Sequence, residues 1–299
     1  MSSPAPAQSP PTVEPDLAAG TPPPGRPAIH VQGLRKVYGS GEAAVAALAG
    51  IDLHIGAGRF TAVMGPSGSG KSTLLHCVAG LDTVTAGRIG YADPDGVGWT
   101  DITTLPDRAL THFRRDRIGF VFQSFNLLPT LTAEQNILLP LDLAGRKVDR
   151  DWFDGLVSTL GIADRLRHRP AELSGGQQQR VACARALVTR PTVIFADEPT
   201  GNLDSRSSVE VLSFLRRSVR ELGQTVVMVT HDPAAASYAD RAVLVADGRI
   251  ARDIDMPEPQ EVLDALGSLG DRETLLTDES DDPTGGGSDG AGSDSGDRA

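Results

Sequence analysis

The feature that most constrains the fold is the segment Gly65-Pro66-Ser67-Gly68-Ser69-Gly70-Lys71-Ser72. It matches the pattern G-x-x-x-x-G-K-[ST], follows the apolar run 60–64 and opens the stretch 72–79, which has a helical pattern. A strand, this loop and a helix in that order form a phosphate-binding loop. The glycines let successive backbone N–H groups converge on phosphate oxygens at the helix N-terminus, where the dipole adds positive charge.

The loop predicts a nucleotide site with a metal ion. We expect Lys71 to bridge the β- and γ-phosphates of ATP and Ser72 to coordinate Mg²⁺. A chance match to the pattern is expected in on the order of one in a hundred chains of this length, but the flanking strand and helix favour the phosphate-binding interpretation. The predicted ATP-binding residues here are Gly65, Pro66, Ser67, Gly68, Ser69, Gly70, Lys71, Ser72 and Thr73.

A second apolar run, residues 192–196, ends in the acid pair Asp197-Glu198. The run predicts a buried parallel strand that brings both acids to the sheet edge where the loop lies. Asp197 would then hold Mg²⁺, and Glu198 would accept a proton from the attacking water. An isolated Asp-Glu pair more often caps a helix or a turn. The preceding phosphate-binding loop favours the catalytic interpretation.

The pentapeptide Leu173-Ser174-Gly175-Gly176-Gln177 lies between these two motifs. It offers one hydroxyl group and exposed backbone donors at the start of a predicted helix that ends at Leu187. With it, residues 29 to about 255 resemble the ATP-binding cassette (ABC) family. In that family, the pentapeptide of one subunit closes over the γ-phosphate held by another. The resemblance therefore implies a homodimer in which Ser174, Gly175, Gly176 and Gln177 contact ATP bound to the partner.

The resemblance gives roles to four further residues. Tyr38 matches the aromatic residue that stacks on adenine, and Gln123 matches the glutamine that senses Mg²⁺ and the γ-phosphate. Asp204 matches the acid that communicates across the dimer, and His231 matches the histidine that contacts the γ-phosphate. A lone Tyr or His is more often a packed structural residue, but the order and spacing favour the family roles. The predicted catalytic residues are thus Glu198, His231, Gln123 and Lys71, and the predicted metal ligands are Ser72, Gln123 and Asp197.

The expected fold is α/β, a P-loop NTPase core with an antiparallel β subdomain and an inserted α-helical subdomain. Alternation of Ile51, Leu53 and Ile55 with polar residues indicates a sheet with one exposed face, and strand–helix alternation indicates the parallel core. We place the ATPase domain at 28–256, with its helical subdomain at about 124–190, and a short helical segment at 257–270 that contains one helix over 258–266. Each motif occurs once, so a second cassette is not expected.

Both ends of the chain are expected to be disordered. Residues 1–27 are rich in proline, and residues 271–299 consist mainly of Gly, Ser and acidic residues, a composition too polar to form a core. Residues 271–299 contain nine acidic residues and two arginines, which contribute −7 of the net charge of −11. Solvation is the ordinary role of such a tail, and a regulatory contact is the alternative.

Composition also bears on partners and location. No apolar run reaches the roughly 18 residues that span a bilayer, and residues 1–27 lack the pattern of a signal peptide. We therefore expect a peripheral subunit at the cytoplasmic face of the cell membrane, bound to an integral-membrane permease in a separate chain. The acidic balance lacks the basic stripe of nucleic-acid-binding proteins, so we expect no nucleic acid partner. Cys77 and Cys183 are predicted to be small buried hydrophobic residues.

Within the family, residues 122–129 and 197–204 resemble the lipoprotein-releasing and macrolide-exporting group, which transmits motion to a permease with a large extracytoplasmic domain. Amino-acid importers share much of the first segment but usually carry Ser-Ala where this chain has Gly201-Asn202. An importer of that kind is one alternative. A soluble ABC ATPase of DNA repair or translation is another, although the coiled coil, zinc-binding cysteines or second cassette typical of such proteins are missing from the sequence. Intact Glu198 and His231 oppose a non-hydrolysing adaptor.

Overall fold

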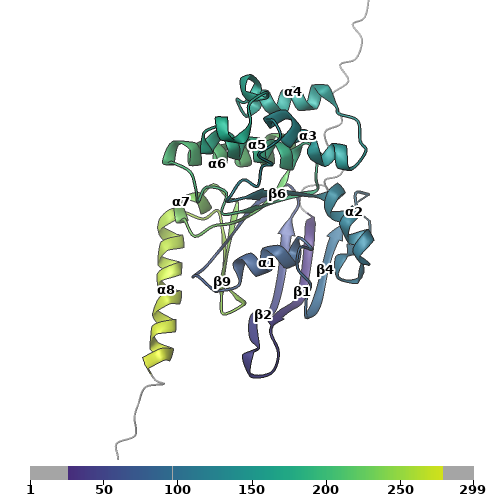
Figure 1. The fold of residues 1–299 in the computed structure, drawn as a ribbon. Helices are drawn as coiled ribbons and strands as arrows, with labels where there is room; N and C mark the ends of the chain where they lie inside the picture. Colours follow the sequence, from purple (N-terminus) through teal and green to yellow (C-terminus); the bar gives the residue numbers. More distant parts are fainter. Residues whose placement is uncertain (1–25, 96, 279–299) are drawn as a thin grey trace, which may run out of the picture.

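The computed structural model describes residues 26–95 and 97–278 (Figure 1). Its strands are β1 Pro27–Tyr38, β2 Val45–Gly56, β3 Phe60–Met64, β4 Ala86–Ala92, β5 Trp99–Asp101, β6 Ile118–Phe122, β7 Val193–Asp197, β8 Thr225–Val229, β9 Arg241–Ala246 and β10 Arg249–Asp255. Its α-helices are α1 Lys71–Val78, α2 Asp107–Arg117, α3 Ala133–Leu143, α4 Arg150–Thr159, α5 Gly175–Leu187, α6 Ser205–Leu222, α7 Pro233–Ala236 and α8 Pro259–Asp278. Short 3-10 turns lie at Gly41–Ala43, Ile102–Thr104, Ala163–Arg165 and Pro170–Glu172.

The central sheet has the strand order β10-β9-β3-β8-β7-β6. Strands β9, β3, β8, β7 and β6 are parallel, and β10 pairs antiparallel at one edge. Strands β3 and β8 are buried along their whole length, which explains their continuous apolar sequence. Strand β8 lies between β3 and β7, with Val229 opposite both Val63 and Asp197. The phosphate-binding loop and the acid pair therefore leave the sheet at the same edge.

A second sheet, ordered β2-β1-β4-β5, is antiparallel throughout. In β2 the side chains of Ile51, Leu53 and Ile55 are buried, whereas those of Asp52 and His54 are exposed. This alternation is the one the sequence predicts for a sheet with a single buried face. The predicted combination of a parallel P-loop core and an antiparallel β subdomain is confirmed.

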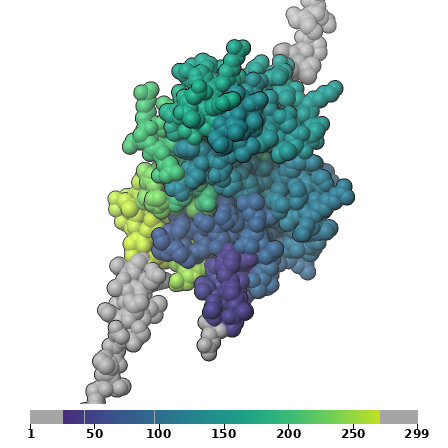
Figure 2. All heavy atoms as spheres, in the orientation of Figure 1, coloured from purple at the N-terminus to yellow at the C-terminus, as the bar shows by residue number. Residues whose placement is uncertain are grey.

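The chain between β6 and β7 contains α3, α4, α5 and two 3-10 turns, and no strand. Side chains of Thr132, Asp149 and Ser174 accept hydrogen bonds from backbone N–H groups at the starts of the three helices, as helix N-caps do. These helices gather at the top of the molecule in Figure 1 and form one lobe in the space-filling view (Figure 2). Their buried residues, such as Ile137, Leu156 and Val181, belong to the same apolar core cluster as Phe60, Ile194 and Met228 of the central sheet.

The C-terminal helix is longer than the sequence indicated. We predicted a helix over 258–266 and a disordered segment from 271, but α8 runs from Pro259 to Asp278. Buried Val262 and Ala265 fix its first turns on the core, and each further residue then adds a hydrogen bond at low cost. Gly267 weakens the helix by about 1 kcal/mol relative to Ala without ending it. Pro27, which we predicted to belong to the N-terminal tail, is the first residue of β1. The predicted tail residues 1–25 and 279–299 lie outside the described residues.

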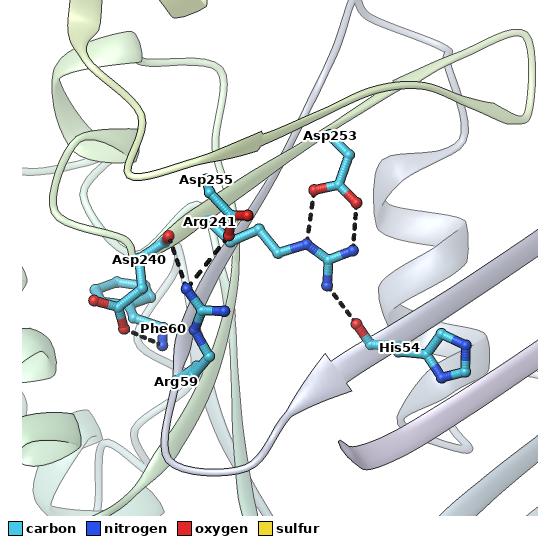
Figure 3. A network of polar contacts seen from close by, with 7 residues as sticks. All are labelled: His54, Arg59, Phe60, Asp240, Arg241, Asp253 and Asp255. Carbon is cyan, nitrogen blue, oxygen red and sulfur yellow. Dashed lines mark hydrogen bonds and ion pairs between the residues drawn. The ribbon is translucent and has the colours of Figure 1, made fainter. Parts of the chain in front are cut away.

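A polar network joins the two sheets (Figure 3). The guanidinium of Arg241 on β9 donates two hydrogen bonds to the Asp253 carboxylate on β10, at 2.7 and 2.5 Å, and a third to the carbonyl of His54 on β2. The hydrogen bonds between the two side chains lower the pKa of Asp253 and raise the pKa of Arg241. Nearby, Asp240 accepts from the N–H of Phe60 at 2.9 Å, where β3 begins. The network therefore holds β2 against the strands that carry the phosphate site.

We predict that Arg241→Met lowers the free energy of unfolding by about 1 kcal/mol, a modest loss because Asp253 is half-exposed and water screens the pair. Since the Asp253 pKa is depressed in the folded state, the pair stabilises the protein above the unfolded carboxyl pKa of about 4, and this contribution is lost as the pH falls through the folded pKa. Denaturant unfolding at pH 7 and at acidic pH measures the difference. The exposed Arg252→Met serves as control, and equal losses in the two variants would contradict the assignment.

Candidate functional site

The loop between β3 and α1 has a backbone that favours glycine at three positions. Gly65, Gly68 and Gly70 have φ values of 147°, 80° and 100°. A Cβ at Gly65 would lie 2.0 Å from the carbonyl oxygen of Val245, and one at Gly70 would lie 2.4 Å from that of Ala47. Conformation and space both exclude a side chain at Gly65 and Gly70, whereas at Gly68 only the backbone conformation disfavours one.

Lys71 lies at the first position of α1, and its ammonium group folds back over the loop. It donates to the carbonyl oxygen of Pro66 at 2.5 Å. Burial lowers the pKa of Lys71, and the Glu198 and Asp197 carboxylates oppose this shift. The nearby carboxylates thus favour the charged form of Lys71, as a phosphate ligand requires.

Asp197 lies at the end of β7, and its carboxylate is partly buried. Burial raises its pKa, His76 and a hydrogen bond from the Ser72 hydroxyl lower it, and the His76 Nε2 is 3.7 Å from Oδ2. The other oxygen, Oδ1, is buried without a hydrogen-bond partner in the described residues. An unpaired buried carboxylate oxygen beside a hydroxyl is a donor set that suits Mg²⁺. The residues present therefore fit the metal that the sequence suggested.

Glu198 follows Asp197 in a strained conformation. Its φ is 48°, a left-handed value that a non-glycine residue rarely adopts, and its N–H donates to the carbonyl oxygen of Val229 at 3.0 Å. Its carboxylate contacts Nδ1 of His231 at 2.8 and 2.9 Å. Glu198 and His231, for which we expected individual roles near the γ-phosphate, are therefore in direct contact. Such strain is characteristic of functional sites.

Gln123 leaves the end of β6 and packs against the Gly201-Asn202 dipeptide. The Asn202 amide donates to the Gln123 carbonyl at 3.0 Å. A Cβ at Gly201 would lie only 2.6 Å from the Gln123 side-chain nitrogen. A larger residue at 201 would displace that side chain, so the Gly201-Asn202 dipeptide directly shapes the surroundings of Gln123.

Tyr38 is held beside the loop by residues that the sequence analysis did not identify. Its hydroxyl donates to Asp82 at 2.6 Å, and a hydrogen bond also links it to Thr73 on α1. The Lys36 ammonium lies 2.7 Å from Asp82 and 4.8 Å from the centre of the Tyr38 ring. One signal was present: the chain has only three lysines, and Lys36 stands two residues before Tyr38. The ring is fixed while 43% of the residue stays exposed.

The pentapeptide forms a second cluster. Ser174 and Gln177 make a reciprocal capping box at the start of α5. A Cβ at Gly176 would lie 2.4 Å from the Ser207 hydroxyl on α6. Asp204 caps α6 and accepts from the Ser207 N–H and hydroxyl at 3.0 and 2.7 Å. Within one chain, the pentapeptide glycines therefore have their nearest neighbours in the segment after Glu198 and in Phe125, and not in the phosphate-binding loop.

Arg185 on α5 is another residue that the sequence analysis missed. Its guanidinium donates to the carbonyls of Phe125, at 2.8 Å, and Asn126. Both residues have left-handed φ values, 60° and 50°, and burial lowers the pKa of Arg185. The charge-assisted bonds offset the strain of the segment that follows Gln123. Its partners are backbone carbonyls, which leave no sequence signal.

Comparisons with known proteins place the chain in a family. The family model described as "ABC transporter" matches residues 48–201. The lipoprotein-releasing system ATP-binding protein LolD of Geobacter metallireducens is 47% identical over 227 residues, which are 75% of this chain and 98% of LolD. The macrolide export ATP-binding/permease protein MacB of Marinobacter nauticus is 44% identical over 255 residues, 85% of this chain. The chain spans only 38% of the length of that relative.

Solved structures agree with the sequence relatives. A dimeric post-hydrolysis structure of the ATP-binding cassette MJ0796 bound to ADP and Pi has a TM-score of 0.67 and 39% identity, and the match covers 76% of this chain and 98% of that one. Among the described residues, no helix combines the length and the apolar character needed to cross a membrane. Sequence, fold and site lead to one conclusion: the chain belongs to the ABC transporter family and is an ATP-binding, ATP-hydrolysing subunit.

Proposed function

We propose that two copies of this chain enclose two ATP molecules and drive a separate membrane permease, in a system of the lipoprotein-releasing or macrolide-exporting type. The observation that carries the proposal is the convergence of Lys71, Asp197, Glu198 and His231 where β3, β7 and β8 end. The similarity to LolD and MacB and the Gly201-Asn202 contact with Gln123 support the subgroup. The sequence of events begins with ATP binding, which closes the dimer, and ends with hydrolysis, which reopens it.

In this proposal, the residues of one copy bind ATP and those of the partner complete the site. Lys71 and the loop N–H groups hold the phosphates, Tyr38 packs on the adenine, and Ser174 and Gly176 of the other copy contact the γ-phosphate. Glu198 takes a proton from water as the water oxygen bonds to the γ-phosphorus. The bond to the β-phosphate oxygen then breaks and ADP keeps the electron pair. His231 orients the Glu198 carboxylate through the 2.8 Å contact.

The proposed metal ligands are Ser72, Asp197 and Gln123. When bound, Mg²⁺ would neutralise charge on the β- and γ-phosphate oxygens. The unpaired Oδ1 of Asp197 and the Ser72 hydroxyl support this role. Gln123 approaches from a different strand, which would make its position sensitive to the helical insertion.

We assign permease docking to a groove of about 380 Å³ between β6, α3 and α5. Its lining includes Phe120, Phe122, Leu139 and Leu143, and Leu143 is 73% exposed. Asn126 and Arg185 also line it, so an occupant would touch the segment that begins at Gln123. The proposed occupant is a helix of the permease. The relative MacB is named as an ATP-binding/permease protein, and this chain matches only 38% of its length, so a permease part can account for the remainder of MacB. The chain would then bind peripherally at the cytoplasmic face of the membrane.

Glu198→Gln should lower the single-turnover rate of ATP hydrolysis by about 100-fold or more, because the variant lacks the proton acceptor. ATP should still bind, and a dimer should accumulate. Phosphate release and size-exclusion chromatography with ATP measure the two effects. Glu221→Gln, which changes an exposed acid on α6, should behave as the wild type. Normal turnover in Glu198→Gln would rule out the proposed base.

Lys71→Ala should weaken ATP binding by about tenfold or more, because a charge-assisted phosphate contact is lost. Equilibrium titration with a fluorescent ATP analogue measures the affinity. Lys147→Ala removes an exposed lysine and should leave the affinity unchanged. If the two variants bind ATP equally well, Lys71 has no role in phosphate binding.

Leu143→Asp should abolish copurification of the permease while the isolated chain keeps its ATPase activity, because a charge would be buried in an apolar contact. Affinity purification from native membranes in mild detergent, followed by mass spectrometry, identifies the partner. Leu263→Asp on α8 is the matched control. Undiminished permease recovery with Leu143→Asp would place the docking surface elsewhere. Recovery of soluble partners alone with the wild type would contradict the transporter proposal.

A further inference from the structure

Gln179 is a fully buried polar residue on α5, with 0% exposure. Its side-chain Nε2 donates to the carbonyl of Pro199 at 2.6 Å and to that of Phe122 at 3.3 Å. Phe122 directly precedes Gln123, and Pro199 directly follows Glu198. One amide group therefore joins the backbone beside two residues with proposed roles in hydrolysis.

The position of this bridge is informative. The parallel ladder between β6 and β7 pairs Phe122 with Asp197, the last residue of each strand. Gln123 and Glu198 are the next residues along the two chains, so the regular ladder no longer fixes the distance between them. Gln179 provides a link just beyond the end of the ladder. A second link comes from Asn202, whose amide donates to the Gln123 carbonyl.

The glutamine has an energetic cost beside its two hydrogen bonds. The Oε1 of Gln179 is buried and has no hydrogen-bond partner in the described residues, an arrangement that costs free energy. Around it, α5 buries small apolar residues such as Val181, Ala182 and Cys183. An apolar side chain would remove the unpaired oxygen, but it could not join the two carbonyl groups.

Helix α5 connects Gln179 to the pentapeptide and to Arg185. Gln179 lies on the same helix as the capping residue Ser174 and as Arg185, which binds the carbonyls of Phe125 and Asn126. Displacement of α5 would therefore move the backbone next to Gln123 and Glu198 together. This contact therefore connects the helix that begins at the pentapeptide with the ends of β6 and β7.

We propose that Gln179 is a positioning residue for ATP hydrolysis: its amide bridges the Phe122 and Pro199 carbonyls and fixes Gln123 and Glu198 at their working separation. The inference rests on the proposed roles of Gln123 and Glu198. It assigns Gln179 no contact with ATP. Its removal should therefore impair the chemical step far more than nucleotide binding.

The test compares Gln179→Leu with Gln224→Leu in the full chain. Gln224 is a matched control, because it is 5% exposed and its Nε2 donates to a backbone carbonyl, that of Pro191, at 2.9 Å. Gln179→Leu should lower the single-turnover rate by about tenfold or more with KM for ATP within about twofold. Gln224→Leu should keep its rate even if its melting temperature falls equally. A Gln179→Leu rate within about twofold of the wild type, or rates that follow melting temperature in both variants, would overturn the proposal.

Two further variants keep the test decisive if Gln179→Leu does not fold. Gln179→Met preserves the side-chain length and removes the amide, and Asn202→Ala removes the second link at an exposed position. Each should lower the rate without weakening ATP binding, and the opposite pattern would contradict the proposal. Glu198→Gln distinguishes failure of the proposed catalytic site from failure of the Gln179 bridge. If it retains turnover, the site assignment fails, whereas full loss there beside normal Gln179 variants refutes only the bridge.

Discussion

The rest of the site depends on the parallel pairing of β3, β8 and β7. Because Val229 of β8 lies opposite both Val63 and Asp197, the phosphate-binding loop, the acid pair and the segment containing His231 leave the sheet at one edge. All residues of these three strands are buried except Asp197 at the end of β7, so the hydrogen bonds between the strands are shielded from water. Lys71, Asp197 and Glu198 thus influence one another electrostatically although they come from distant parts of the sequence.

Near this edge of the sheet, several residues of the proposed site have a strained backbone or a buried oxygen without a hydrogen-bond partner. Glu198 has a left-handed φ, and so do Phe125 and Asn126 beyond Gln123. Within residues 26–95 and 97–278, one oxygen of Asp197 and one of Gln179 are buried without a hydrogen-bond partner. Each feature opposes folding, and the packed sheets and helices must compensate for it. The antiparallel sheet, tied to the core through Arg241, contributes to that support.

Much of the fold follows from the sequence because buried parallel strands and glycine loops have strong local patterns. The apolar runs before Gly65 and Asp197 predict two buried parallel strands that end at the same edge of the sheet. The alternation around Leu53 predicts a sheet with one exposed face. The Glu198–His231 contact joins residues far apart in sequence and depends on strand order, so no local pattern contains it. Gln179 was missed because its partners are carbonyls, which every residue has. The length of α8 was underestimated because docking of its first turns outweighs its glycines.

The central claim is that each ATP site is composed of two copies of this chain. Cysteines placed at exposed Ser67 in the loop and at Ser174 in the pentapeptide test it directly, in a Glu198→Gln background; the native Cys77 and Cys183 are buried. The account predicts a disulfide-linked dimer that forms with Mg²⁺ and ATP and not without nucleotide, and that requires both engineered cysteines. Failure to form this dimer under saturating ATP, or a cross-link within a single chain, would contradict the composite site.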